Sequence, residues 1–176
     1  KFKRANPFPH LVLSNFFIKE KLRLVLSSVL GESFFEKNSD LFQFRQTNEI
    51  SSSESKVLKD FHLFFSSGEF GEYIKKITGL SLDLGKIDMS GFIYGKTDYL
   101  LPHDDRLEKR KIAYVVNFSD FKRKDGGRLQ FFSSRRLWFR CFLCFSACFI
   151  LFSRFRRRRR KTLDGLRSNT SISKLY

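Results

Sequence analysis

The chain of 176 residues is long enough for one domain with a hydrophobic core, and its 41% hydrophobic and 30% charged residues are typical of a folded soluble protein. Its net charge of +16 is unevenly distributed along the chain. Residues 133–176 hold 12 of the 34 basic residues and one of the 18 acidic residues, which gives them a net charge of +11. Residues 1–132 therefore have a net charge of +5. The charge of the whole chain therefore does not identify a nucleic-acid-binding protein.

The first half of the chain predicts a strand followed by helices. The segment "PFPHLVLSNFF" (7–17) is typical of a strand that leads into a turn. Over residues 18–30 the apolar side chains recur at helical spacing, and Gly31 is a suitable helix end. Residues 33–47 are rich in aromatic residues and predict one or two strands. Apolar spacing then predicts a second helix over about residues 55–66 and a third in "GEFGEYIKKITGL".

The second half of the chain changes to strand patterns. Residues 86–105 predict strands separated by turns, and residues 111–121 predict a further strand. A hairpin turn is expected at "KDGG" (124–127), because Asp-Gly and Gly-Gly supply the positive φ angles that such turns need. "RLQFF" (128–132) is then the returning strand. This order of elements predicts an α+β domain with helices packed on one face of an antiparallel sheet.

The character of the chain changes at Ser133. The segment that follows is rich in Phe, Cys and Arg, and it has neither the period of a strand nor the pattern of a capped amphipathic helix. We therefore expect two regions, a domain over residues 1–132 and a basic tail of doubtful order over residues 133–176. Because residues 139–152 lack period-2 alternation, we expect them to be unable to replace a strand of the sheet, and the tail to be poorly ordered or to form an isolated helix.

Four interpretations of the tail remain open. The first is a transmembrane helix, but the apolar run 141–152 has 12 residues. A membrane span needs about 20, so membrane association is not expected. The run "RFRRRRRK" (154–161) fits a nuclear signal or a patch for non-specific nucleic-acid binding. Cys141, Cys144 and Cys148 have a spacing that suits metal ligands, but a fourth ligand is missing. The fourth interpretation is a tail without a selected function.

His103 and Asp105 are the strongest candidates for metal ligands. They lie two residues apart on a predicted strand, so both side chains can point to the same side, while Asp104 points to the other. A His and a carboxylate are two of the three groups that hold Fe(II) in oxygenases and leave positions open for reactants. The triplet alone is a weak motif, because a surface His beside a turn-forming Asp pair explains it as well.

The surrounding sequence makes the motif more specific. The stretch "IDMSGFIYGKTDYLLPHDDRLEKRKIAYVVNFSDFKRKDGGRLQFF" and the earlier "PFPHLVLSNF" resemble the 2-oxoglutarate- and iron(II)-dependent oxygenases that hydroxylate a proline of a ribosomal protein, the prolyl 3-hydroxylase family. The resemblance covers residues 7 to about 132. It implies a double-stranded β-helix (jelly-roll) oxygenase domain with N-terminal helices, incomplete at its C-terminal side.

The same resemblance implies cofactors, a partner and a location. It assigns His103 and Asp105 as ligands of Fe(II), 2-oxoglutarate as co-substrate and ascorbate as the reductant. The implied substrate is a protein of the small ribosomal subunit, and the implied location is the cytoplasm, the nucleus or both. The absence of Cys from residues 1–132 suits a reducing compartment.

One further site residue follows from the resemblance. Relatives place a Tyr hydroxyl near 2-oxoglutarate on the strand after the iron strand, and the matching position here is Asn117. An Asn amide can still donate a hydrogen bond to a carboxylate. If Asn117 points inward, Tyr114 lies on the opposite face of the strand, where we expect it to pack against a helix.

The third iron ligand has no counterpart in this sequence. In the family a second His lies well downstream, and an Arg beyond it binds the distal carboxylate of 2-oxoglutarate. The three His residues of this chain are His10, His62 and His103, and none follows the motif. We expect His62 to be a partly buried or surface residue of the second helix, and His10 an ordinary strand residue.

We therefore expect the chain as given to be inactive, with a domain that lacks its later strands. Such a domain exposes apolar side chains of its inner face, and the sequence suggests Ile112, Val116 and Phe131. Two alternatives to an oxygenase remain open. The chain can be a non-catalytic protein-binding module, or a basic protein associated with membranes or nucleic acid.

Overall fold

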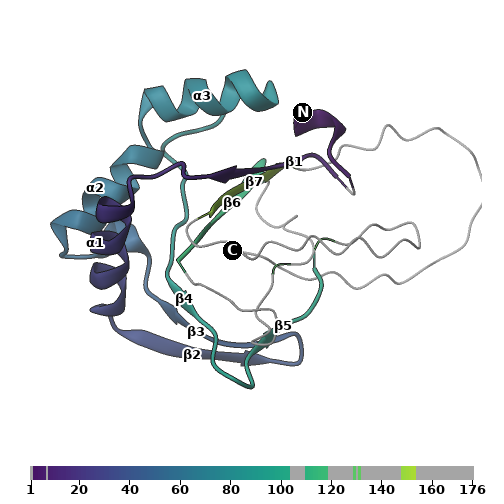
Figure 1. Cartoon of the computed structure of the whole chain (residues 1–176). Coiled ribbons are helices and arrows are strands. Elements are labelled where there is room, and N and C mark those ends of the chain that lie inside the picture. Colours follow the sequence, from purple (N-terminus) through teal and green to yellow (C-terminus); the bar gives the residue numbers. More distant parts are fainter. Residues whose placement is uncertain are drawn as a thin grey trace, which may run out of the picture.

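Two antiparallel sheets and three α-helices form the part of the chain that the structure describes (Figure 1). The structure is a computed structural model, and it describes residues 2–6, 8–103, 110–118, 129, 131 and 148–153. The first sheet has the strand order β1-β7-β6, and the second has the order β2-β3-β4 with β5 also paired to β3. Helices and antiparallel sheets in one fold confirm the predicted α+β class.

The α-helices form where apolar spacing predicts them: α1 (Lys19–Leu30), α2 (Lys56–Phe65) and α3 (Gly68–Thr78). The Ser67 hydroxyl caps the start of α3 by accepting a hydrogen bond from the Phe70 backbone N–H at 3.2 Å. Gly79 ends α3, and its φ of 77° lies in the left-handed region that glycine adopts without strain. The described residues also contain two short 3-10 helices, η1 (Phe2–Arg4) and η2 (Ile50–Ser52).

The first sheet has β7 at its centre and consists of β1 (His10–Ser14), β6 (Ile112–Asn117) and β7 (Cys148–Ser153). β7 runs antiparallel to both neighbours, so β1 and β6 run parallel to each other. The prediction that residues 139–152 cannot replace a strand is therefore wrong for residues 148–152. The tail is expected to be poorly ordered or to form an isolated helix, and residues 148–153 do neither, while the rest of residues 133–176 lies outside the described residues. A short unbroken apolar run suits a strand that lies between two others, where alternation is not required.

Most of the predicted hairpin after β6 lies outside the described residues. The sequence predicts a hairpin through "KDGG" (124–127), which lies outside the described residues, and a returning strand at "RLQFF" (128–132). Leu129 and Phe131 are the residues of that segment that the structure describes, and both lie outside any strand. Among the described strands, β6 pairs with β7, from the predicted tail, and the predicted hairpin stays a prediction.

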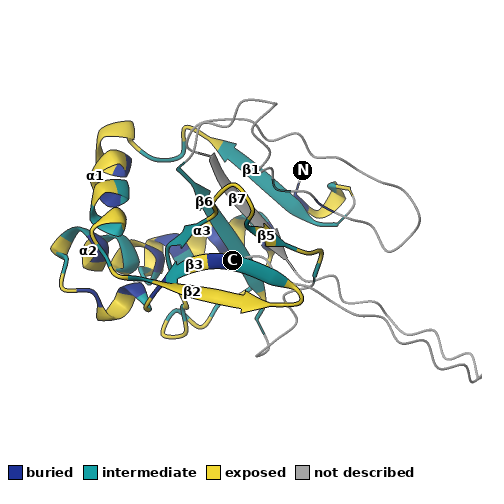
Figure 2. Cartoon of the chain, turned by 90° about the horizontal axis from the view of Figure 1, so that it is seen from below, coloured by how far each residue is buried: buried dark blue, intermediate teal, exposed yellow. Residues whose placement is uncertain are grey.

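The second sheet lies on the opposite side of the fold from α3 (Figure 1) and consists of β2 (Phe34–Ser39), β3 (Phe42–Thr47), β4 (Phe92–Ile93) and β5 (Tyr99–Leu100). β2 is an edge strand and is exposed over most of its length (Figure 2). Phe44 of β3 is buried and contacts the rings of Phe42, Phe92 and Tyr94 at centroid distances of 5.1, 5.5 and 5.4 Å. These contacts give the sheet one aromatic face.

The main core lies between α2, α3 and the first sheet. Phe65 and Ile74 are fully buried there, together with Phe2 and Phe70. The sheet residues that pack against this core are Leu11, Leu13, Ile112, Tyr114 and Val116. The expectation that Ile112, Val116 and Phe131 are exposed is therefore wrong: the first two are half-buried against the helices, and Phe131 is buried.

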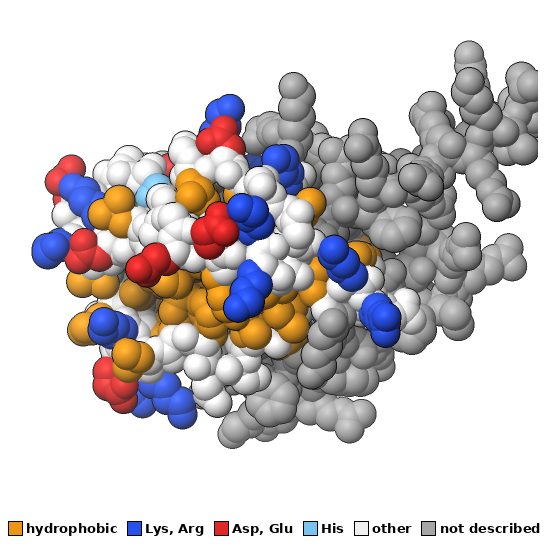
Figure 3. Space-filling view, turned by 90° about the horizontal axis from the view of Figure 1, so that it is seen from above, with side chains coloured by type: hydrophobic (Ala, Val, Ile, Leu, Met, Phe, Trp, Pro, Cys, Tyr) orange, Lys and Arg blue, Asp and Glu red, His pale blue; other side chains and the backbone are white. Residues whose placement is uncertain are grey.

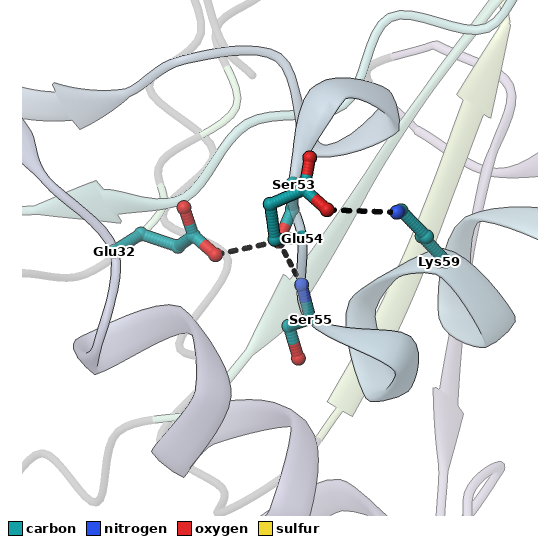
Figure 4. Close-up of polar contacts among 5 residues, drawn as sticks. All are labelled: Glu32, Ser53, Glu54, Ser55 and Lys59. Carbon is teal, nitrogen blue, oxygen red and sulfur yellow. Dashed lines mark hydrogen bonds and ion pairs between the residues drawn. The ribbon is translucent and has the colours of Figure 1, made fainter.

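A buried hydroxyl links the end of α1 to the start of α2 (Figure 4). Ser53 Oγ donates a hydrogen bond to Glu32 Oε1 at 2.5 Å and accepts one from the Ser55 N–H at 3.0 Å. Glu54 forms an exposed ion pair with Lys59 at 3.5 Å. Buried polar groups need such partners, and Ser53 therefore helps to fix α2 beside the second core cluster of Val25, Ile50 and Leu58.

Hydrophobic side chains form a band on the side of the fold that carries α3, bordered by charged side chains (Figure 3). Near α3, the Phe16 ring contacts the rings of Tyr73 and Phe64 at 5.7 and 6.3 Å. Phe64 and Tyr73 are nevertheless partly exposed. Among the described residues, no helix is both long and apolar enough to cross a membrane.

Candidate metal and 2-oxoglutarate site

The two faces of β6 have different surroundings. Tyr114 stacks on Phe65 of α2 with a centroid distance of 4.7 Å and an interplanar angle of 2°. Side chains alternate along a strand, so the residues that face the helices are every second one, and Asn117 lies on the opposite face from Tyr114. The predicted packing of Tyr114 on a helix is confirmed. Asn117 therefore lies on the other face of the sheet, which we call the helix-free face because no α-helix of the described residues packs against it. The role of Asn117 in binding stays a prediction.

His103 follows β5 and is held by its own backbone segment. The Leu101 N–H donates a hydrogen bond to the Leu41 carbonyl at 2.9 Å, which anchors this segment to the β2–β3 turn. His103 Nδ1 lies 2.7 Å from the Leu101 carbonyl oxygen. A carbonyl can only accept, so Nδ1 is assigned as the donor, and a neutral ring then has its lone pair on Nε2. This is the tautomer of a His that binds a metal through Nε2.

Asp105 lies outside the described residues, as does Asp104. The pairing of His103 with Asp105 therefore rests on their spacing in the sequence. Within the ranges that the structure describes, no group of three or more His, Cys, Asp and Glu side chains lies close enough to hold a metal.

A charged cluster beside the helix-covered face of β6 has no sequence motif. The Met89 N–H donates a hydrogen bond to Glu49 Oε1 at 2.7 Å, and Arg110 Nη2 donates to Asp88 Oδ2 at 3.0 Å. Burial raises the pKa of Glu49, while the hydrogen bond from Met89 opposes the shift. Burial, with the charges of Glu49 and Asp88, raises the pKa of Tyr114 above its usual range. Sequence reasoning missed this cluster because its members come from distant segments.

The two remaining histidines lie in different surroundings. His62 is half-buried on α2, as predicted, and its Nε2 is buried without a hydrogen-bond partner among the described residues. His10 begins β1, and its Nδ1 lies 2.9 Å from the Phe8 carbonyl oxygen. The His10 ring also packs on Phe131 at a centroid distance of 4.8 Å.

Residues 89–140 match the model of the 2OG-Fe(II) oxygenase superfamily. This segment contains His103, Asp105 and Asn117, and it extends beyond residue 132, where the resemblance was expected to stop. The chain belongs to the 2OG-Fe(II) oxygenase superfamily. The family assignment predicted from the HxD motif and its flanking strands is therefore confirmed.

Several curated members of the superfamily are similar to most of this chain. Prolyl 3-hydroxylase OGFOD1 of Xenopus laevis is 32% identical over 129 residues, which cover 72% of the chain and 25% of the relative. Its Mus musculus counterpart is 32% identical over 132 residues, covering 73% of the chain and 24% of the relative. Prolyl 3,4-dihydroxylase OGFOD1 of Ostreococcus tauri is 31% identical over 150 residues, covering 74% and 28%. The chain thus spans about a quarter of the length of the relatives it matches.

The described residues of the chain fit part of an iron and 2-oxoglutarate site. His103 has the tautomer of a metal ligand, and Asn117 has an amide that can donate to a carboxylate. Asp105 is predicted, by its place in the sequence, to supply the carboxylate of the site. No His follows His103 in the sequence, so the downstream ligand is not matched by any residue of this chain.

Proposed function

We propose that the chain provides the metal-binding portion of a 2-oxoglutarate- and Fe(II)-dependent dioxygenase that hydroxylates a proline of a ribosomal protein. The observation that carries the proposal is the family match over residues 89–140, since it spans both predicted ligands. The relatives support it because they are prolyl hydroxylases by name. A ribosomal substrate and a double-stranded β-helix rest on the resemblance of the sequence alone.

Each residue has a specific role in this proposal. His103 Nε2 and the Asp105 carboxylate bind Fe(II), and Asn117 donates a hydrogen bond to 2-oxoglutarate from the helix-free face of β6. When bound, iron and 2-oxoglutarate would supply, together with O₂, the hydroxylation of a C–H bond, with one oxygen atom going to the product, the other to succinate, and CO₂ released. The chain's own part is to hold the His103 tautomer through the Leu101 carbonyl and to direct the Asn117 amide away from the helices.

The chain as given is proposed to be inactive in turnover. Two ligands hold a transition metal more weakly than three, and no downstream Arg can be assigned to the distal carboxylate of 2-oxoglutarate. We also propose residues 1–132 as the partial oxygenase domain, ascorbate as the reductant, and a location in the cytoplasm, the nucleus or both. Non-specific nucleic-acid binding through residues 154–161 stays a prediction.

A comparison of two proteins tests the proposed function. Succinate formation from 2-oxoglutarate is measured for the chain as given and for a chimera. In the chimera, the segment that follows the matched region of the Xenopus laevis relative replaces residues 133–176. We expect no turnover from the chain and turnover from the chimera that Asp105→Asn abolishes. Succinate from the unmodified chain that depends on Asp105 contradicts the inactivity, and a folded but inactive chimera contradicts the proposed function.

A further inference from the structure

Separate segments bring basic side chains to the C-terminal end of α3. Phe2 of η1 is buried in the main core against which α3 packs, so the residues that follow it lie at a fixed place. The Lys3 ammonium group lies beside Gly79, the residue that ends α3, since a Cβ atom added there would be 3.2 Å from Lys3 Nζ. Lys111, just before β6, donates a hydrogen bond from Nζ to the Ser81 carbonyl at 2.9 Å. η1, the end of α3 and the start of β6 therefore meet at one place.

Basic side chains at this place have no carboxylate partner in the part of the chain that the structure describes. Nearby acidic residues are paired with other lysines, Glu72 with Lys75 at 3.0 Å and Asp83 with Lys86 at 3.1 Å. The basic side chains that form no ion pair are exposed, and we call them the basic edge: Lys3, Arg4, Lys76 and Lys111. The basic edge therefore presents uncompensated positive charge to solvent.

The C-terminal end of a helix attracts cations, and this explains part of the arrangement. Such an end carries roughly half a negative elementary charge, which a single lysine neutralises. Lys3 has the position for that role, because its ammonium group lies beside Gly79. Lys111 binds a carbonyl beyond the helix, and the other two members of the basic edge add further charge. Positive charge in such excess at fixed positions is typical of a surface for polyanions.

An exposed aromatic ring lies next to the basic edge on α3. Tyr73 and Lys76 are three positions apart, which makes them neighbours on the helix surface. The Tyr73 ring is 37% exposed and packs on Phe16 at a centroid distance of 5.7 Å. Figure 3 shows basic side chains at the right-hand end of the hydrophobic band, while the acidic side chains lie toward the left. Cations and an exposed ring therefore lie side by side.

We infer that the basic edge and Tyr73 bind a single strand of nucleic acid. The cations contact backbone phosphates and the Tyr73 ring stacks on a base, which is how proteins hold single strands without reading their sequence. The surface is distinct from the basic run 154–161, because it is built by the folded domain. The inference goes beyond the proposed function, since binding here needs neither a metal nor turnover.

A membrane surface is the other partner that basic and apolar side chains can suit. The carboxylates of α3 argue against it, because Glu69 and Glu72 are exposed on the helix that a bilayer would cover. Glu69 lies seven positions before Lys76, about 10 Å along the helix. A single strand can cross the basic edge without meeting Glu69, whereas a flat anionic bilayer over α3 meets both carboxylates. The charges of α3 therefore favour a nucleic acid.

Binding of a labelled single-stranded RNA of about 12 nucleotides, followed by fluorescence anisotropy, tests the inference. The 176-residue chain is measured as it is and with every Arg of residues 156–160 replaced by Ser, so that this run adds no binding of its own. In that background the edge variant carries Lys3→Gln, Lys76→Gln and Lys111→Gln. The matched control has the same net charge and replaces exposed lysines of α1 and β2: Lys19→Gln, Lys21→Gln and Lys37→Gln. Circular dichroism checks that each variant is folded.

We expect the edge variant to bind about 100-fold more weakly at about 0.1 M salt, because each lost phosphate contact removes about 0.7 from the slope of log K against log[salt]. The control variant should bind like its background. Tyr73→Ala should weaken binding by about 5–150-fold, the range for one stacked base, and Tyr73→Phe should bind like its background.

Equal weakening in the edge and control variants would mean that net charge alone drives binding, and the inference would be wrong. It would also be wrong if replacement of the Arg run removed all binding of RNA. Vesicles of phosphatidylcholine and phosphatidylserine are tested with the same variants. Vesicle binding that depends on the basic edge, without binding of RNA, would replace the inference by a membrane surface. These outcomes leave the succinate assay unaffected, so the proposed function is tested separately.

Discussion

The two faces of the first sheet carry different kinds of residue on the same strands. Toward the helices β1 and β6 present Leu11, Tyr114 and Val116, all packed against the aromatic core. Toward the other side β6 presents Asn117, the residue predicted to bind 2-oxoglutarate. Neighbouring positions thus divide into a face that stabilises the fold and a face that carries the candidate chemistry. Substitutions of neighbouring residues can therefore separate stability from ligand binding.

The largest expected effect is on the helix-covered face. Phe65 is fully buried and its ring contacts Tyr114, Phe61 and Phe70. Phe65→Ala removes this ring from the centre of the core and should lower the free energy of unfolding by about 3–5 kcal/mol. Chemical denaturation of the variant and the wild type measures the difference.

The adjacent residue Phe64 is the control for this variant. It is 40% exposed, so Phe64→Ala should cost clearly less than Phe65→Ala. Equal losses of stability at positions 64 and 65 would show that the helix-covered face is not the centre of the core.

Two adjacent valines of β6 test the difference in packing between the two faces of the first sheet with a smaller change of side chain. Val116 packs against the helix-side core, whereas the alternation of the strand points Val115 to the helix-free face. Val116→Ala should lower the free energy of unfolding by about 1–2 kcal/mol, and Val115→Ala should cost less. Thermal or urea denaturation of both variants gives the comparison. A larger loss of stability for Val115→Ala than for Val116→Ala would mean that the helix-free face is the better packed of the two.

Sequence patterns predict the helices well, because their apolar spacing follows one face of each helix. β1 lies within the segment that the sequence predicts as a strand. They are less informative for β6, where "IAYVV" is apolar at every position and leaves the two faces undecided. Tyr114 and Asn117 are separated by an odd number of positions along the strand, and this alone places them on opposite faces. β7 could not be predicted, since an unbroken apolar run in a basic tail has no strand period. Its place between β1 and β6 depends on pairing with segments more than 30 residues away.

The candidate site divides in the same way. His103 and Asp105 are recognisable because the two predicted ligands lie two residues apart in one segment. The basic edge, by contrast, has no motif, since its residues meet only when η1 and the start of β6 pack at the end of α3. The charged cluster of Glu49, Asp88 and Arg110 is likewise assembled from three separate segments. Contacts of this kind depend on the tertiary fold and leave no local pattern.

The smallest expected effect on stability comes from the charged cluster of Glu49, Asp88 and Arg110. This cluster is also the exception to the apolar character of the helix-covered side. Burial raises the pKa of Glu49 in the folded protein, while Asp88 adds to the shift and His62 and Arg110 oppose it. The folded state therefore holds this proton up to a higher pH than the unfolded chain, whose Glu titrates near the ordinary value of 4.5. The stability linked to this proton is complete below pH 4.5 and is lost as the pH rises through the folded pKa.

Glu49→Gln tests this linkage, because Gln keeps an oxygen that can accept the Met89 N–H but cannot ionise. The free energy of unfolding is measured by urea denaturation from about pH 4 to about pH 7. As the pH rises from 4.5, the variant should gain stability relative to the wild type, and the gain should level off above the folded pKa. Glu54→Gln is the matched control, since Glu54 has a side chain that is 99% exposed, and its curve should run parallel to that of the wild type. Parallel curves for Glu49→Gln and the wild type would mean that the Glu49 carboxylate is solvated in the folded protein. The helix-covered side of β6 would then be open to water at its charged end, and the contrast between the two faces would hold only for the aromatic part of the sheet.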